Sequence, residues 1–363
     1  MGNSFSSSTN VQTWSNEKRL TGGARMQGRR NAMEDFDSHV SAFISPEWDL
    51  FVCLDGHGGD ATASFVSKRL PEVLATHLTA ESSADDIRAA LVKTFEEVDA
   101  NVLLRNEEVR DFSGACCVCA VVTQTHFVVA YCGDCVGFLL RVNEGGGHVV
   151  QELTRDHEPS VPEERARIEA AGSRVYGDGR MSRVDGDLNV SRAFGDIQFK
   201  PRYKRRVYPV SAEDTSLLEA EPKVRLSHRT FAVTAHPDTC VVERTVYDVM
   251  LLLGSDGLVD LANGTVTDKS AVPTQMWTST KTDGHTDASH MAVLACDTAY
   301  KAGSADNITA LVWLSPLVPA WHQKSALEGW EGYMQGRRAA LRAREPRDQE
   351  PDPFPAQSVK EEE

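Results

Sequence analysis

An aspartate that directly follows an apolar run is the first feature of this sequence that could carry chemistry. The run Asp49–Leu54 leads into Asp55–Gly59 (DGHGG), so we expect the Asp55 carboxylate to emerge where a buried strand ends. The glycines would let the main chain approach a ligand closely, so that a backbone carbonyl could join the carboxylate. Carboxylates are preferred ligands of hard divalent cations, and one carboxylate can bridge two of them. The alternative is a plain Asp-Gly turn.

Other acidic residues repeat this arrangement. The apolar run Val249–Gly254 leads to Asp256 in a glycine turn, and Asp306 stands just before the apolar run Ile308–Leu314. The pair Glu34-Asp35 lies upstream, near the start of an expected strand. Buried carboxylates need partners, and a bound cation can serve several of them at once. Together these residues predict a site for divalent cations.

The eight cysteines allow a different metal. The pairs Cys116/Cys119 and Cys132/Cys135 have the Cys-x-x-Cys spacing of structural zinc sites. However, the first pair lies in an apolar run (ACCVCAVV) without turn residues, and cysteine is often a plain buried hydrophobe. We therefore favour a reduced, intracellular protein over a zinc site.

Strand and helix patterns alternate in blocks over residues 21–315. Apolar runs with the length of buried strands occupy residues 40–44, 49–54, 113–122, 126–132, 137–142, 241 onward, 249–254 and 308–314. Amphipathic helical patterns occupy residues 61–78, 84–104, 161–171 and 288–301. Short turns between successive strands favour antiparallel pairing. The blocks of strands and helices indicate an α+β fold in layers.

The motifs, in their order along the chain, resemble the metal-dependent protein phosphatase family of the 2C type over about residues 21–315. The resemblance implies two stacked antiparallel β-sheets flanked by helices, an α-β-β-α sandwich, with a binuclear metal centre between the sheets. The motifs that carry it are Gln27–Arg30, Met33–Asp35, Asp55–Gly59, Ser113-Gly114, Cys132–Asp134, Leu153–His157, Ser191–Asp196, Asp256-Gly257 and Asp306-Asn307.

The resemblance also assigns ligands for two Mn²⁺ or Mg²⁺ ions. Asp55 would bridge both ions, and the carbonyl of Gly56 would complete one coordination shell. Asp256 and Asp306 would hold the other ion. The pair Glu34-Asp35 would bind through water or orient metal-bound water.

Three more residues receive roles from the resemblance. Arg30 would bind the substrate phosphate, His57 would protonate the leaving serine or threonine oxygen, and Asp134 would support a third, weaker metal ion. A water activated by the two ions would attack phosphorus directly, without a covalent phospho-enzyme.

The sequence departs from the family pattern at several positions. Arg29 stands where the family usually has Trp, so the choice of Arg30 relies on the alignment of Met33–Asp35. Val259 replaces another common Trp, which should alter packing rather than metal binding. The stretch 196–249 matches poorly.

The predicted function is therefore that of a serine/threonine protein phosphatase acting on phosphoproteins. One alternative is a catalytically inactive, phosphatase-like regulatory binding protein, which loss of Asp55, Asp256 or Asp306 would mark; all three are present. A two-metal nuclease or phosphodiesterase is a further alternative. The net charge of −15, from 38 Lys+Arg against 53 Asp+Glu, argues against a nucleic-acid partner.

The N-terminus predicts contact with membranes but no membrane span. No apolar run approaches the ~18 residues that a spanning helix needs, and residues 1–10 lack the apolar region of a secretory signal. Gly2 and Ser6 fit the N-myristoylation pattern. One acyl chain gives only weak, reversible binding, so we expect a cytoplasmic, monomeric protein that also associates with membranes.

The expected organisation has three parts: a flexible, Ser-rich arm over residues 1–20, a catalytic domain over 21–316, and a C-terminal segment over 317–363. In the last part, residues 324–344 could form a helix, followed by a disordered tail rich in Pro and charge. The basic segment 200–206 (KPRYKRR) suggests either a solvated loop or a surface that favours acidic substrates.

Overall fold

The computed structural model of the chain describes residues 11–143, 147–200, 231–260, 268–283 and 287–315. The expectations for Gly2, for residues 201–206 of the basic segment and for residues 317–363 lie outside these ranges and stay predictions. Within the ranges, every helix is too short or too polar to cross a membrane.

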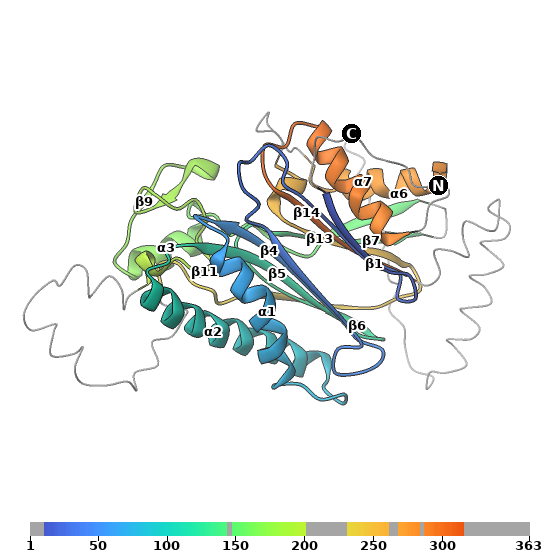
Figure 1. The fold of residues 1–363 in the computed structure, drawn as a ribbon, viewed down its shortest axis with the longest axis horizontal. Helices are drawn as coiled ribbons and strands as arrows, with labels where there is room; N and C mark the ends of the chain where they lie inside the picture. The colour runs from blue at the N-terminus through green and yellow to red at the C-terminus, as the bar shows by residue number, and fades with distance from the viewer. Residues whose placement is uncertain (1–10, 144–146, 201–230, 261–267, 284–286, 316–363) are drawn as a thin grey trace, which may run out of the picture. The chain divides into compact units, whose positions relative to one another are not determined.

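Most of the described strands form two large antiparallel sheets (Figure 1). The first sheet has the order β1 (Val11–Asn16), β2 (Thr21–Met26), β14 (Ile308–Leu314), β13 (Asp248–Gly254), β7 (Val136–Val142) and β8 (His148–Glu152). The second sheet has the order β12 (Asp238–Glu243), β6 (His126–Cys132), β5 (Gly114–Val122), β4 (Asp49–His57) and β3 (Phe36–Ser41), with β11 (Phe194–Gly195) paired to β5.

Helices cover the outer faces of both sheets. Helices α1 (Ala61–Ala75) and α2 (Ala84–Val109) pack on the second sheet, and α6 (Ala271–Asp283) and α7 (Ala288–Lys301) pack on the first (Figure 1). A shorter helix, α3 (Pro162–Ala170), lies beside the hairpin of β9 (Val175–Tyr176) and β10 (Arg183–Val184). The predicted α+β fold with an α-β-β-α arrangement is confirmed.

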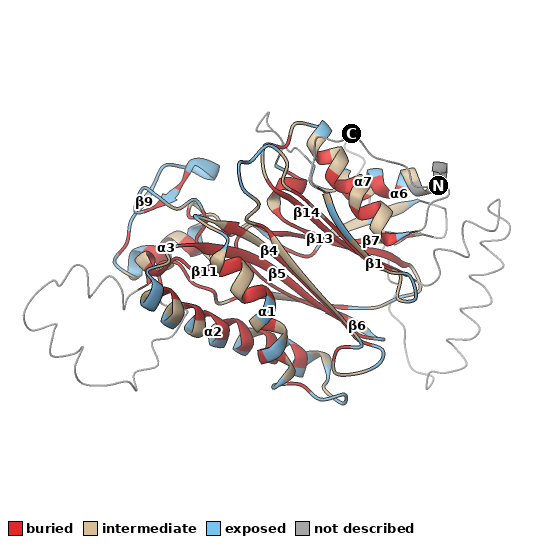
Figure 2. Cartoon of the chain, in the orientation of Figure 1, coloured by how far each residue is buried: buried red, intermediate tan, exposed pale blue. Residues whose placement is uncertain are grey.

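This layering buries apolar side chains on both faces of the central strands (Figure 2). Among the described residues, one apolar core lies between the second sheet and helices α1 and α2, and another lies between the two sheets. All residues of β5 are buried, which explains its continuous apolar run. Because β5 is buried on both faces, it is a rigid support for the residues that the neighbouring strands β4 and β6 carry.

The cysteines of β5 serve these cores. Cys119 faces the helices, whereas Cys116 faces the space between the sheets, because residues three apart on a strand point to opposite faces. Cys132 and Cys135 are divided between the cores in the same way. All eight cysteines are free thiols. Neither Cys-x-x-Cys pair can therefore hold one zinc ion.

Helix α2 shows why the local sequence pattern identified a helix here. Ser83 caps its N-terminus, since Ser83 Oγ accepts from Asp86 N at 3.2 Å and Asp86 Oδ2 accepts from Ser83 N at 2.9 Å. The helix continues to Val109, beyond the predicted end at residue 104, and stops at Arg110 in the left-handed conformation.

Strand β2 of the first sheet was not predicted from the sequence pattern. Glycines disfavour strands, so Thr21–Met26 (TGGARM) gave no strand signal. In the structure, a Cβ on Gly22 would lie 2.3 Å from Ser289 N of α7, and one on Gly23 would lie 2.6 Å from the Trp14 ring. The glycines therefore allow α7 and β1 to approach β2 closely.

Two predictions are corrected, and two further elements were not predicted. The expected arm over residues 1–20 is wrong for its second half, because β1 pairs with β2 along its whole length. The predicted strand 40–44 is displaced: β3 ends at Ser41, and Ala42 and Ile44 adopt positive φ. Strand β8 and helix α6 were missed, since β8 is a half-exposed edge strand and α6 carries many polar residues.

Candidate functional site

Three carboxylates from separate parts of the chain meet where the two sheets face each other. Asp55 lies near the end of β4 in the second sheet, and Asp134 lies in the turn from β6 to β7. Asp256 begins the short helix η4 (Asp256–Leu258), which follows β13 of the first sheet. One potential ligand oxygen of each lies within 4.8 Å of those of the other two.

The electrostatics of these carboxylates favour a bound cation. Burial, and then repulsion from the neighbouring carboxylates, raises the pKa of Asp55 and Asp256 well above the usual range. Burial also raises the pKa of Asp134. The Oδ1 atom of Asp256 is buried without a hydrogen-bond partner among the described residues. A divalent cation would supply the missing partner and offset the repulsion, so these residues fit the predicted metal.

Asp306 lies next to this group and is paired with Arg30. The distance from Arg30 Nη2 to Asp306 Oδ2 is 2.6 Å, and the Arg30 side chain is 56% exposed. Burial lowers the pKa of Arg30, but Asp306, Asp256 and Asp55 outweigh this effect and raise it. Arg30 therefore lies in the field of the same carboxylates and remains accessible from solvent.

Arg29, at the position of the family's usual Trp, has a different environment. Its guanidinium stacks on the Tyr300 ring at 4.1 Å from the ring centroid and donates to the carbonyl oxygens of Tyr300 and Ser304. These carbonyls lie at the C-terminal end of α7, where a cation is favourable. Arg29 is therefore engaged with α7, whereas Arg30 is paired with Asp306.

Glu34 and Asp35 occupy two different surroundings. Glu34 Oε1 accepts a hydrogen bond from Gly59 N at 2.8 Å, beside the Asp55 loop. Asp35 is buried, and its Oδ2 accepts from Ser255 Oγ at 2.8 Å and Thr309 Oγ1 at 2.7 Å. Burial raises the pKa of Asp35 to about 7 despite these bonds. Asp35 thus anchors the strand end that precedes Asp256.

Gly56 must be glycine for a steric reason. A Cβ at this position would lie 2.3 Å from the carbonyl oxygen of Glu34. The missing side chain lets the segment that carries Glu34 lie directly against β4.

His57 pairs with a carboxylate to which the sequence gave no role. Its Nε2 lies 2.8 Å from Oδ2 of Asp196, which is buried. Burial lowers the pKa of His57, but Asp196, Asp134 and Glu34 outweigh this effect and raise it. A Cβ on Gly114 would lie 2.1 Å from Asp196 Oδ2 and 2.3 Å from His57 Nε2. The Ser113-Gly114 and Ser191–Asp196 motifs therefore form one feature: glycine makes the room that the His57–Asp196 pair fills.

A buried ion pair holds the turn that carries Asp196. Asp99 of α2 accepts hydrogen bonds from Gly195 N at Oδ1 and from Lys200 Nζ at Oδ2, both at 3.0 Å. Lys200 is buried, so the first residue of the expected basic loop is not solvated. Asp196 itself has a left-handed backbone, φ 49° and ψ 49°.

The turn that carries Asp134 is held in a comparable way. Gly133 N donates to His157 Nδ1 at 3.1 Å, and Gly133 has φ +94°. A Cβ on Gly133 would lie 2.2 Å from the Cys116 sulfur. The sequence associated Asp134 only with a weak third ion, whereas the structure places it beside Asp55 and Asp256.

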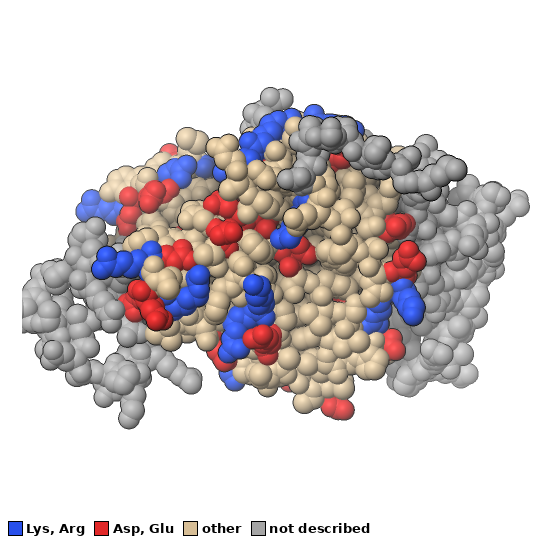
Figure 3. Space-filling view, viewed as in Figure 1, with Lys and Arg blue, Asp and Glu red and all other residues tan. Residues whose placement is uncertain are grey.

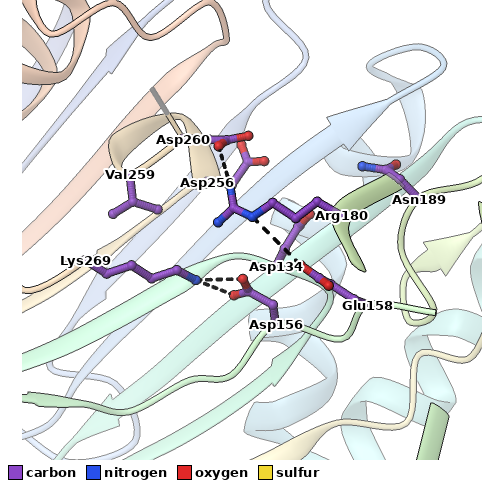
Figure 4. Close-up of a pocket in the computed structure, with 9 residues that line it drawn as sticks. All are labelled: Asp134, Asp156, Glu158, Arg180, Asn189, Asp256, Val259, Asp260 and Lys269. Carbon is purple, nitrogen blue, oxygen red and sulfur yellow. Dashed lines mark hydrogen bonds and ion pairs between the residues drawn. The ribbon is translucent and has the colours of Figure 1, made fainter. Parts of the chain in front are cut away.

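A pocket with an empty volume of about 500 Å³ adjoins the carboxylates (Figure 4). Three ion pairs join residues of its lining: Arg180 with Asp260, Arg180 with Glu158, and Lys269 with Asp156. Sequence reasoning missed this pocket because its charged residues follow no recognisable spacing. The residues that line it are Asp134, Asp156, Glu158, Arg180, Asn189, Asp256, Val259, Asp260 and Lys269.

The charged side chains on one face of the described residues do not suggest a nucleic-acid surface. On the face shown in Figure 3, acidic and basic side chains of the described residues are interspersed, without a continuous basic stripe.

Comparisons with known proteins agree with the geometry. Residues 20–308 match the family model of protein phosphatase 2C. The chain is 32% identical over 267 residues to the rice protein named probable protein phosphatase 2C 68. This alignment covers 67% of this chain and 64% of that protein. It is 29% identical over 349 residues to protein phosphatase ppm-1.A of Caenorhabditis elegans, covering 89% of this chain and 65% of the relative. The chain thus spans slightly less than two thirds of the length of these relatives.

Solved structures show the same fold. A serine-threonine phosphatase 2C from Toxoplasma gondii superposes with a TM-score of 0.60 at 19% identity, covering 81% of this chain and 95% of that chain. A sex-determining protein of C. elegans superposes with a TM-score of 0.63 at 23% identity, covering 85% and 65%.

Proposed function

The chain belongs to the protein phosphatase 2C family, and from this premise we propose that it hydrolyses phosphoserine and phosphothreonine in proteins. The observation that carries the proposal is the convergence of Asp55, Asp134 and Asp256 within 4.8 Å, beside the accessible guanidinium of Arg30. Buried carboxylates that repel one another are costly to a fold, and binding a cation gives them a function.

The residues that would hold Mn²⁺ or Mg²⁺ are the carboxylates of Asp55, Asp256 and Asp306 and the carbonyl of Gly56, with Asp134 available to a third ion. Their oxygen atoms suit hard cations. When bound, such ions supply a water that is ionised near neutral pH and positive charge for the phosphoryl oxygens.

Arg30 would bind and orient the phosphate. A guanidinium presents parallel N–H donors that match two phosphate oxygens. Since its side chain is 56% exposed, Arg30 can accept this ligand without unfolding its surroundings. Glu34 and Asp35 would bind the metal ions through water or orient metal-bound water.

His57 would donate a proton to the leaving oxygen. Its Nε2 is bound to Asp196, which leaves Nδ1 as the donor nitrogen. An imidazole titrates near neutrality, and the adjacent carboxylates favour its protonated form. Asp196 would hold the ring in this orientation.

The test is phosphate release from a phosphothreonine peptide by the purified chain. We expect release with Mn²⁺ or Mg²⁺ and none with EDTA. Asp55→Ala and Asp256→Asn should each lower turnover by about 10³-fold or more, since they remove groups that support the reacting charge. Asp85→Asn is the matched control, because the Asp85 side chain is 84% exposed on α2. Cation binding by a chain that releases no phosphate would instead favour the inactive regulatory alternative.

A further inference from the structure

The β9–β10 hairpin stands apart from both large sheets. Its two strands form a two-stranded sheet of their own, and η1 (Gly179–Met181) lies at its tip. The residues between the two strands and η1 are anchored near α3: Ser160 N donates to Ser182 Oγ at 3.1 Å, and Arg165 Nη2 donates to the carbonyl of Gly177 at 3.4 Å.

Arg180 ties the tip of this hairpin to the candidate active site. Its Nη1 donates to Asp260 Oδ1 at 2.6 Å, and its Nε lies 3.9 Å from Glu158 Oε1. Asp260 lies two residues beyond the end of η4, the element that begins with Asp256. Figure 4 shows the Arg180 side chain reaching toward Asp260 across the pocket that Asp134 and Asp256 also line. The tie thus joins residues 80 positions apart over the pocket.

The Arg180–Asp260 ion pair can open readily. Nearly half of each side chain is exposed, 45% for Arg180 and 49% for Asp260, and exposed ion pairs compete with water and salt. Gly177 and Gly179 have positive φ values of 79° and 52°, which glycine adopts without cost. Besides Arg180, the tip is held by Ser160 Oγ, which donates to the Gly179 carbonyl at 3.4 Å, and by Arg165 Nη2, which lies 3.9 Å from Asp178 Oδ1. These contacts are long, so the tip is held weakly.

The outer surface of the hairpin suits a polypeptide. Met181 is 74% exposed and Tyr176 is 51% exposed, two of the large apolar side chains exposed among the described residues. Apolar side chains beside a polar pocket are typical of a surface that another chain covers.

We propose that Arg180 is a specificity-determining residue, whose tie to Asp260 restricts the entry of polypeptide beside the carboxylates of Asp134 and Asp256. This inference rests on the proposed phosphatase function. A small phosphate ester needs only the space around Asp55 and Arg30. A phosphothreonine within a protein brings flanking residues, and these must separate Arg180 from Asp260 before they can occupy the pocket.

The experiment compares Arg180→Ala with Arg174→Ala in the full chain with Mn²⁺. Arg174 is exposed just before the same hairpin and does not line the pocket, so it controls for loss of a positive charge there. The substrates are p-nitrophenyl phosphate and phosphorylated casein. Hydrogen exchange over residues 175–184 reports opening of the hairpin, and exchange over α2 reports the fold.

For Arg180→Ala we expect KM for phosphocasein to fall about threefold, the size of effect that one exposed ion pair supplies, with kcat within about twofold. Both constants for p-nitrophenyl phosphate, and all constants of Arg174→Ala, should stay within about twofold of the unmodified chain. Exchange over residues 175–184 should accelerate only in Arg180→Ala.

Two results would overturn the inference while leaving the phosphatase function intact. A higher KM for phosphocasein in Arg180→Ala would make Arg180 a substrate contact rather than a restriction. Equal changes with both substrates would show that the tie does not distinguish them. Absence of hydrolysis by the unmodified chain would overturn the proposed function, and this inference with it.

Discussion

At the scale of single residues, the carboxylates of the candidate site lower the stability of the metal-free fold. Asp55, Asp134 and Asp256 lie close together with raised pKa values, and Asp256 Oδ1 lacks a partner among the described residues. By contrast, His57 Nε2 and Asp196 Oδ2 are paired within the chain at 2.8 Å, an arrangement that depends on the missing side chain of Gly114. The carboxylate cluster therefore lacks a partner that a ligand could supply, whereas Asp196 already has His57.

Gly114→Ala tests the importance of the His57–Asp196 pair. The added methyl would overlap both partners, so the histidine should leave its position. We expect turnover of a phosphothreonine peptide to fall about 10²-fold, the usual contribution of a general acid. p-Nitrophenyl phosphate should lose less, because its leaving group needs little protonation.

His57→Gln should give the same substrate pattern as Gly114→Ala in these assays. Equal losses on aryl and alkyl phosphates in both variants would contradict a proton-donating His57. Circular dichroism checks that each variant is folded.

At the scale of elements, one carboxylate joins α3 to the segment that carries Asp196. Glu164 Oε2 accepts from Arg167 Nη2 at 2.5 Å and from Ser191 Oγ at 2.6 Å, and Oε1 accepts from Arg192 Nη2 at 2.6 Å. Arg192 also donates to Asp238 Oδ1 of β12 at 2.7 Å. This network fixes residues 191–196 between a helix and an edge strand, and so places Asp196 beside His57.

Glu164→Gln should destabilise the fold by about 3 kcal/mol, because Arg167 and Arg192 would lose a buried counter-charge. Burial raises the pKa of Glu164, but Arg192 and Arg167 outweigh this effect and lower it from 4.5 to about 2. The folded-state pKa is thus below the unfolded value, so the stabilisation is complete above about pH 4.5 and is lost as the pH falls toward 2.

Urea unfolding at several pH values measures this effect. The unmodified chain should lose stability between about pH 4.5 and 2 more steeply than Glu164→Gln. Glu163→Gln, on the exposed neighbouring residue, should stay within about 0.5 kcal/mol of the unmodified chain. Similar costs for the two variants would show that the network contributes little.

At the scale of the molecule, the candidate site lies between the two sheets. Asp55 comes from the second sheet and Asp256 from the turn after β13 of the first, so a cation that binds both would join the layers. A ligand that binds only the folded state stabilises it by mass action. Metal binding and global stability should therefore be linked.

Addition of saturating Mn²⁺ should raise the melting temperature by about 5 °C or more, and EDTA should reverse the shift. Asp256→Asn should lose most of this shift. Its metal-free form should melt at the same or a higher temperature at pH 7, because a carboxylate whose folded pKa is raised opposes folding once the pH exceeds its unfolded value. Asp85→Asn should keep the full shift. Scanning fluorimetry measures all of these, and an unmodified chain insensitive to Mn²⁺ would contradict the metal site.

The sequence by itself determined the elements whose signal is local. Strand β6 has the predicted bounds, and β14 and α7 match as well, because an apolar run or a helical period is contained in neighbouring residues. The glycine turns after apolar runs likewise identified Asp55 and Asp256, and the order of the motifs indicated the family. β2 escaped detection because its glycines serve contacts with α7 and Trp14, which are distant in the chain.

Only the tertiary structure decided which side chains become partners. It put Asp134 beside Asp55 and Asp256, paired Asp306 with Arg30, turned Arg29 toward α7, and brought Asp196 to His57. These partners are separated by many tens of residues, and a side chain's choice among acceptors depends on burial and space that no local pattern encodes. The local pattern of apolar residues therefore predicts the helices and strands, whereas the charged groups of the site come together only where the two sheets meet.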